Sequence, residues 1–308
     1  MSLINRSSFR SDLIPLVKDW FGDAYKNYNS LYDKILKVKQ ADDRAYQVNA
    51  MVSTMLPLQQ KDEGTVLTLD SARQGITPRY VHTTYALGFI ITMEMMEDGD
   101  AFKNAKRFTE MLKKSALQTK EILAANVYNN AFSSTATMSG GDGVALCSTS
   151  HPTRSGTQSN VLSTGSVDMS EAALEQATID IKNMLDDRGN RIMLLPQKLI
   201  CSVTDEPLAN RILKSTMRSG SADHDINYLR DSGLIKEIVA NPYLTAAHRW
   251  FVTTGVQEDG DGVQMLIRKE ASIDDGNDFE TKNNKFSAVA RTSTGWDDFR
   301  CVIGSDGP

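Results

Sequence analysis

Cysteine is scarce in this sequence, and its three copies lie far apart. Cys147, Cys201 and Cys301 form no C-x-x-C pair, and none has a histidine at the spacing of zinc ligands. Disulfide frameworks need several paired cysteines, and structural zinc sites need clustered cysteine and histidine ligands. We therefore expect neither feature. The sequence also contains no recognisable motif for binding another metal or a cofactor, and we expect none.

Long apolar runs are also missing. No stretch approaches the roughly 18 consecutive apolar residues of a membrane-spanning helix, and the first ten residues contain no apolar core of a signal peptide. We expect no membrane segment, and synthesis in the cytoplasm. Apolar residues make up 40% of the 308-residue chain, which is enough to fill a sizeable core.

A general excess of positive charge is absent, since 34 Lys and Arg residues stand against 39 Asp and Glu, for a net charge of −5. Tight binding of nucleic acid by the whole surface is therefore not expected. One local exception is a basic ridge within a predicted helix, formed by Lys103, Lys106, Arg107, Lys113 and Lys114. A solvated helix face is the simpler interpretation, and a surface that faces a polyanion is the alternative.

Motifs for chemistry are absent or weak. The sequence contains no G-x-x-x-x-G-K-[ST] phosphate loop, no G-x-G-x-x-G and no G-x-S-x-G. Cys147 and His151 are the best nucleophile and base, but no third group is identified that would orient the base. The acidic runs 259–262 and 274–278 lack the twelve-residue spacing of a calcium loop, so hairpin turns explain them better.

Hydrophobic periodicity predicts a mixed helix and strand chain. Residues 101–133 contain no Gly or Pro and carry apolar residues at helical spacing, which predicts a helix about 50 Å long. Shorter helices are predicted at 11–38, at 170–187 with Ser170 as N-cap, and at 206–217. Strands are predicted at 46–52, 81–91, 198–203, 234–239, 250–254, 263–268 and 286–291.

The segment 57–79 looks like an excursion between two strands. It contains Lys61, Asp62, Glu63 and Gly64, a short strand candidate at 66–69, and Arg73. Loops of this length inside compact domains are uncommon and tend to be functional. It is either a surface hairpin of no particular role or an arm that packs on a neighbouring subunit.

Several motifs in the second half of the chain carry a family resemblance. They are Asp142-Gly-Val-Ala-Leu-Cys-Ser-Thr-Ser-His-Pro152 with Gly156 and Asn160, then 186–190 (DDRGN), 241–245 (NPYLT), 250–252 (WFV) and 295–298 (GWDD). Residues 80–98, including 84–89 (TYALGF), and the excursion add to them. The chain resembles the major capsid proteins of tailed bacteriophages, in particular the Mu-like major head subunit group.

This resemblance implies an α+β fold of the Hong Kong 97-like type. Residues 1–45 would be an N-terminal arm that reaches a neighbour, and 46–95 an extended β-hairpin loop with its flanking strands. Residues 96–166 would form a peripheral domain around the spine helix 101–133, residues 167–262 an α/β axial domain, and 263–308 the return to the peripheral domain. The loop residues Lys61, Asp62, Glu63, Gly64 and Arg73 would contact another subunit.

The resemblance also implies a role for the polar loop 142–164. Because this loop follows the spine helix and precedes the axial domain, we expect it to be a structural joint between them. Its fixing residues would be Asp142, Gly143, His151, Pro152, Gly156 and Asn160, acting through turns and hydrogen bonds.

The implied function is a non-enzymatic one. The chain would form hexamers and pentamers of an icosahedral virion shell around double-stranded DNA, assembled in the host bacterial cytoplasm with a separate scaffolding protein and a portal, and the basic ridge would face the lumen. Lys61 lies where a crosslinking lysine would be, but no acceptor is identifiable, so we expect a non-crosslinked shell. The alternatives are an encapsulin-like compartment shell and a hydrolase that uses Cys147 and His151.

Overall fold

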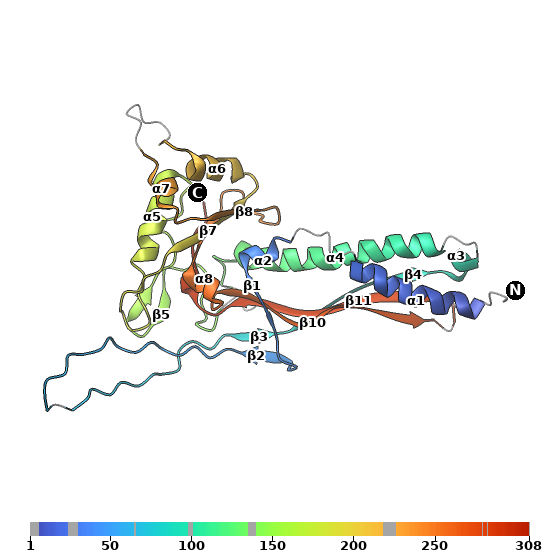
Figure 1. Ribbon diagram of the computed structural model, residues 1–308, viewed down its shortest axis with the longest axis horizontal. Helices are drawn as coiled ribbons and strands as arrows, with labels where there is room; N and C mark the ends of the chain where they lie inside the picture. Colours follow the sequence, from blue (N-terminus) through green and yellow to red (C-terminus); the bar gives the residue numbers. More distant parts are fainter. Residues whose placement is uncertain are drawn as a thin grey trace.

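The computed structural model describes residues 6–23, 30–64, 66–97, 101–134, 140–217, 226–278, 280–281 and 283–307. The molecule is elongated (Figure 1). A long helix and a long β-hairpin run side by side along its axis, a second sheet with its own helices stands at one end, and an extended loop projects near that end. The α+β class predicted from the sequence is therefore confirmed.

The first sheet runs along the axis and has the strand order β1-β10-β11-β4. Its strands are β1 (Lys37–Gln40), β10 (Val263–Asn277), β11 (Asn284–Trp296) and β4 (Thr83–Ile91). β1 pairs in parallel with β10, whereas β10, β11 and β4 pair antiparallel. Asp274 and Asp275, which we placed in a hairpin turn, lie inside β10 because that strand continues well beyond its predicted end.

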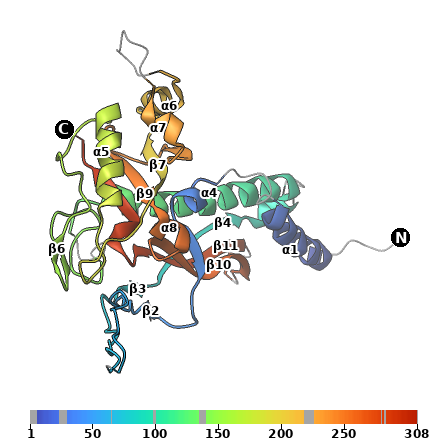
Figure 2. The same cartoon turned by 60° about the vertical axis from the view of Figure 1, so that its left-hand side comes forward.

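Two helices cover one face of this sheet (Figure 2). The longer one, α4 (Ala101–Asn129), confirms the predicted spine helix and ends four residues earlier than expected. The other, α1 (Arg6–Asp23), buries Val17 and Phe21 against the sheet and α4. This helix is part of the predicted N-terminal arm, residues 1–45, and its apolar side chains pack on the same chain. A contact of the arm with a neighbour stays a prediction. Residues 1–5 and 24–29 of that arm lie outside the described residues.

The second sheet has the order β12-β9-β7-β8. Its strands are β12 (Val302–Ser305), β9 (Trp250–Thr254), β7 (Pro196–Ser202) and β8 (Glu237–Asn241), with helices α5 (Glu171–Lys182), α6 (Glu206–Lys214), α7 (Tyr228–Ser232) and α8 (Gly255–Asp259). Ser170 caps α5 as predicted, because its hydroxyl accepts a hydrogen bond from the Ala173 amide. The predicted return segment 263–308 contributes β10 and β11 to the first sheet and its last strand, β12, to the second, where β12 pairs with β9.

The extended loop is paired only at its base. β2 (Tyr46–Val48) pairs with β3 (Arg79–Val81), and backbone hydrogen bonds continue the pairing as far as Ser53 and Arg73. Farther out, the described residues form no β-ladder, so the strand candidate at 66–69 is wrong. The physical reason is exposure: these residues have no sheet beside them to supply hydrogen-bond partners or cover their side chains.

Candidate functional site

The predicted joint lies between the two sheets. It begins with a tight turn in which Asp142 Oδ1 accepts a hydrogen bond from the Val144 amide at 3.1 Å, and Gly143 has φ +77°. Gly140 lies against the ring of Trp296, where a Cβ atom would be only 2.1 Å from the indole. The turn can therefore pack directly on the end of β11 only because it carries no side chain there.

Three of the predicted joint residues form one buried network. His151 Nδ1 lies 2.7 Å from Asp142 Oδ2, and His151 Nε2 lies 3.1 Å from Asn160 Oδ1. The imidazole stacks on Phe299 with ring centroids 4.0 Å apart and meets Trp296 edge-on at 6.0 Å. His151 is thus held on its two nitrogens and across its face.

Asn160 links the joint to the crossing between the sheets. Its side-chain NH2 group donates to the carbonyls of Leu146 at 2.7 Å, Phe299 at 2.9 Å and Val302 at 3.2 Å. Its Oδ1 accepts from the Ser148 amide at 2.8 Å. Phe299 belongs to the 3-10 helix Phe299–Cys301, which connects β11 of the first sheet with β12 of the second. One fully buried side chain therefore joins the loop to that connection.

These contacts also define the hydrogen-bonding role of the His151 ring. Because the NH2 group of Asn160 is used by three carbonyls, the atom that faces Nε2 is the amide oxygen, an acceptor, so Nε2 carries a hydrogen. On the other side of the ring, Nδ1 is hydrogen-bonded to the carboxyl group of Asp142. The pair is completely buried, which makes loss of either partner costly.

The remaining joint residues form a small hairpin, β5 (His151–Thr153) with β6 (Gly156–Gln158). Pro152 is exposed in it, and Gly156 has φ +132°, which favours glycine at this position. The tip of the hairpin touches the turn 186–190, since the Arg154 amide donates to Asp187 Oδ1 at 3.1 Å. The six predicted residues therefore divide into a buried network and an exposed turn.

A second buried polar cluster escaped the sequence analysis. Tyr80 OH donates to Asp297 Oδ1 at 2.5 Å, and Asp297 Oδ2 accepts from Gln264 at 2.6 Å and from Asn49 at 2.9 Å. Burial raises the pKa of Asp297, although these three hydrogen bonds work in the opposite direction. Gly295 leaves room for the ring of Tyr80. The cluster fixes the base of the extended loop to the first sheet, and only the GWDD run hinted at it.

The hydrolase alternative does not fit this geometry. Burial raises the pKa of the Cys147 thiol, so the reactive thiolate is disfavoured. Both ring nitrogens of His151 already have partners, Asp142 and Asn160. A Cβ atom on Gly304 would be 2.9 Å from the Cys147 sulfur, which shows how tightly the thiol is packed. Cys147 therefore behaves as a small apolar core residue.

Metal and membrane chemistry find no support in the described part of the chain. There, no group of three or more His, Cys, Asp or Glu side chains is arranged to hold a metal ion. The acidic run 259–262 ends α8, where Gly260 has φ +95°. Among the described helices, none combines the length and the apolar character needed to cross a membrane.

The basic ridge is only partly a surface. Lys103, Lys106, Arg107 and Lys114 are exposed on α4. Lys113 is completely buried, which corrects our placement of it on the ridge: its Nζ donates to the Gly22 carbonyl at 3.0 Å. The correction has a simple cause, because α1 packs over this side of α4.

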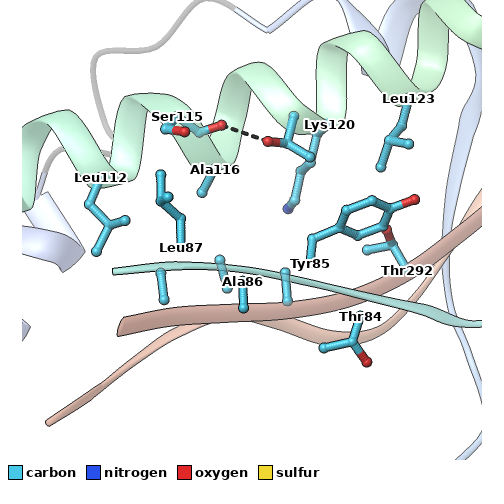
Figure 3. Close-up of a pocket in the computed structure, with 14 residues that line it drawn as sticks. Thr84, Tyr85, Ala86, Leu87, Leu112, Ser115, Ala116, Lys120, Leu123 and Thr292 are labelled. Carbon is cyan, nitrogen blue, oxygen red and sulfur yellow. Dashed lines mark hydrogen bonds between the residues drawn. The ribbon is translucent and has the colours of Figure 1, made fainter. Parts of the chain in front are cut away.

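Figure 3 shows a cavity of about 440 Å³ between α4 and β4. Tyr85 and Leu87 point from the strand toward the helix, and Ala116 faces them from the helix. The Lys120 amine, which also lines the cavity, pairs with Glu270 at 2.7 Å. The lining therefore offers apolar side chains, hydroxyls and a paired amine, which do not make a catalytic arrangement.

The extended loop carries the predicted intersubunit residues on a fully open segment. Lys61, Asp62, Glu63, Gly64 and Arg73 are all exposed.

Comparisons with known proteins identify the family. The model of a family described as phage capsid protein matches residues 75–304, well over half of the chain. No curated protein matches the sequence.

Among solved structures, the chain is similar to the capsid of an empty GTA particle, with a TM-score of 0.56, 13% identity and 89% of each chain covered. It is also similar to the capsid of Myoviridae phage XM1, with a TM-score of 0.53, 9% identity, and 92% of this chain and 93% of that chain covered. A virus-like particle from Pyrococcus furiosus is also similar, with a TM-score of 0.51, 10% identity, and 94% of this chain and 98% of that chain covered. The structural likenesses concern the fold, and the family match adds the function. The chain therefore belongs to the phage capsid protein family, as a structural protein of the head shell with the Hong Kong 97-like fold.

Proposed function

We propose that this chain assembles into hexamers and pentamers of an icosahedral head that encloses double-stranded DNA. The observation that carries the proposal is the apolar surface of the extended loop. Leu58, Val66 and Leu69 are 103%, 90% and 92% exposed, far more than isolated surface residues need to be. Covering such a side chain is worth roughly 1.5–3 kcal/mol. A neighbouring copy, in a family whose members build shells, is the cover that we infer.

The rest of the loop serves the same contact. The intersubunit residues would then be Lys61, Asp62, Glu63 and Gly64 near the loop tip, and Arg73 at the end of the paired base. Since no acceptor for an isopeptide with Lys61 is identifiable, the shell is held without covalent crosslinks. Boiling purified shells in detergent tests this point: a single monomer band is expected, and a ladder of multimers would contradict it.

The partners beyond the chain itself are a separate scaffolding protein, a portal and the packaged DNA. The exposed basic residues of α4, Lys103, Lys106, Arg107 and Lys114, face the lumen and touch DNA weakly and without sequence preference. Synthesis and assembly take place in the cytoplasm of the host bacterium, and the protein works without turnover. Correct-sized shells formed efficiently by this chain alone would argue against the scaffolding partner.

Electron microscopy of the purified protein tests the proposal. We expect closed shells from the wild type, with scaffolding protein supplied, and none from the triple variant Leu58→Ser, Val66→Ser, Leu69→Ser. Met193→Ser is the matched control, because Met193 is 96% exposed but lies outside the loop. Normal shells from the triple variant would contradict the role of the loop, and particles with protein contents in place of DNA would point to a compartment.

A further inference from the structure

The turn 186–190 lies beside the neck of the extended loop, which we define as residues 54–56 and 70–71. One carboxylate organises this turn. Asp186 Oδ1 accepts hydrogen bonds from the amides of Arg188 and Asn190, each at 2.8 Å. Its other oxygen accepts from the hydroxyl of Thr54 at 2.6 Å. Gly189 has φ +87° and lies against Ser155 of the β5–β6 hairpin. The turn is therefore rigid, and it already touches one side of the neck.

Arg188 contacts the other side of the neck, at Asp70 and Ser71. Its guanidinium pairs with Asp70 and donates to the Ser71 carbonyl at 2.9 Å, so two of its nitrogens engage one short segment. Asp70 in turn accepts from the amides of Leu56 at 2.9 Å and Ser71 at 2.8 Å, and thereby ties the two halves of the loop together. The Arg188 side chain is only 6% exposed although the loop around it is open.

This arrangement fixes a direction as well as a position. A planar guanidinium that contacts two groups constrains the angle between them, whereas an ammonium group would act as a point charge. The hydrogen bond from Leu56 and the charge of Arg188 both lower the pKa of Asp70, so the pair stays charged near neutral pH. Beyond the pair, the loop has its most exposed apolar residues, Leu58, Val66 and Leu69.

We propose that Arg188 and Asp70 are positioning residues that set the direction in which the extended loop leaves its subunit. The inference rests on the proposed function, since the loop must point at a neighbour for its direction to matter. The exposed part of the loop between the two halves of the neck has few other constraints on its angle. A small change at the neck therefore moves its apolar residues far from the neighbouring subunit that they would contact. A residue that only stabilised the body would have no such effect.

Loop direction can be measured on unassembled subunits with two spin labels, at Lys61→Cys and at Arg211→Cys in α6. The three native cysteines are buried and remain unlabelled in the folded protein. We expect Arg188→Gln to widen the label-to-label distance distribution about twofold, as a released neck behaves as a flexible chain. Arg230→Gln, on the exposed surface of α7, should leave it unchanged. Arg188→Lys should restore it only in part.

Shell formation by the unlabelled variants completes the test. We expect Arg188→Gln to reduce the yield of regular shells at least tenfold while the unfolding midpoint of the subunit stays near that of the wild type. If Arg188→Gln does not fold, Asp70→Asn, which changes only the loop, replaces it. An unchanged distance distribution, or a wider one with wild-type shell yield and diameter, would overturn the inference. Absence of shells from the wild type would instead overturn the proposed function, since the distances are measured without assembly.

Discussion

The side chains of the joint are buried and have partners in the same chain, whereas the apolar side chains of the extended loop are exposed. In the joint, His151 and Asn160 are completely buried, and each polar atom discussed above has a partner in the same chain. In the loop, Leu58 is fully exposed and its neighbours beyond the neck are similarly open. The joint is thus complete in a single subunit, whereas under the proposed function the loop is completed by a neighbouring copy. Both are irregular and lie in the same molecule, so irregular structure by itself does not tell which role a segment has.

The largest effect is expected at Asn160, since its fully buried side chain donates to three backbone carbonyls. Asn160→Ala should lower the free energy of unfolding by on the order of 4 kcal/mol, because each orphaned buried group costs roughly 1–3 kcal/mol. Urea unfolding of the subunit measures this. Asn277→Ala, at an exposed end of β10, is the control and should be nearly neutral. A near-neutral Asn160→Ala would show that the joint is not what connects the sheets.

A smaller loss is expected when the joint loses packing but keeps its hydrogen bonds. Cys147→Ala removes a buried sulfur and should cost about 1 to 2 kcal/mol in urea unfolding. Shells should still form, because the thiol has no chemical role in the proposed function. Loss of shells from a variant that folds normally would reopen the question of what Cys147 does.

Asp186 stands where the two regions meet, and its contribution should depend on pH. Burial would raise its pKa, but hydrogen bonds from Thr54, Asn190 and Arg188 leave the pKa below the ordinary 3.8. A carboxyl group with a lowered folded pKa stabilises the protein above its unfolded pKa, and that stability is lost as the pH falls through the folded value. We expect unfolding experiments to show that Asp186→Asn loses less stability than the wild type between about pH 4 and pH 2. An equal loss of unfolding free energy in the wild type and in Asp186→Asn over this pH range would contradict the prediction.

The smallest effect concerns the exposed face of α4. Reversing the charges of Lys106 and Lys114 to Glu should leave subunit stability within about 0.5 kcal/mol of the wild type, as is usual for surface changes. DNA retention by filled particles should fall modestly and more at low salt, because the contacts are electrostatic. Lys113 is left unchanged in this test, since it is part of the contact with α1. Unaltered retention at every salt concentration would indicate that the face is merely solvated.

Much of the body could be predicted from the sequence because periodicity and capping are local signals. The spine helix, the strand Trp250–Thr254 and the cap at Ser170 all follow from patterns within one segment. The pairing of β12 with β9 could not be predicted in this way, since it depends on a short strand meeting another some fifty residues away. The packing of α1 on α4, which buries Lys113, is likewise a property of two segments together.

The candidate site shows the same division. The polar residues of the joint were recognisable from the loop and its family resemblance. Their division into a buried network and an exposed turn depends on the packing of Phe299 and Trp296 against the loop, which is distant in sequence. Tyr80, Gln264 and Asp297 lie far apart in the sequence, so their cluster could not be predicted from the spacing of residues. The strand predicted at 66–69 failed for a related reason: a suitable composition does not form a strand without a sheet beside it.

The most direct test of the division between joint and loop measures two quantities on two variants. Urea unfolding of the subunit and electron microscopy of assembly are compared for Asn160→Ala and for the triple variant Leu58→Ser, Val66→Ser, Leu69→Ser. The triple variant should unfold as the wild type does and yield no shells, whereas Asn160→Ala should unfold at much lower urea. Normal shells from the triple variant, or wild-type unfolding of Asn160→Ala, would contradict the assignment of the loop to the assembly and of the joint to the subunit.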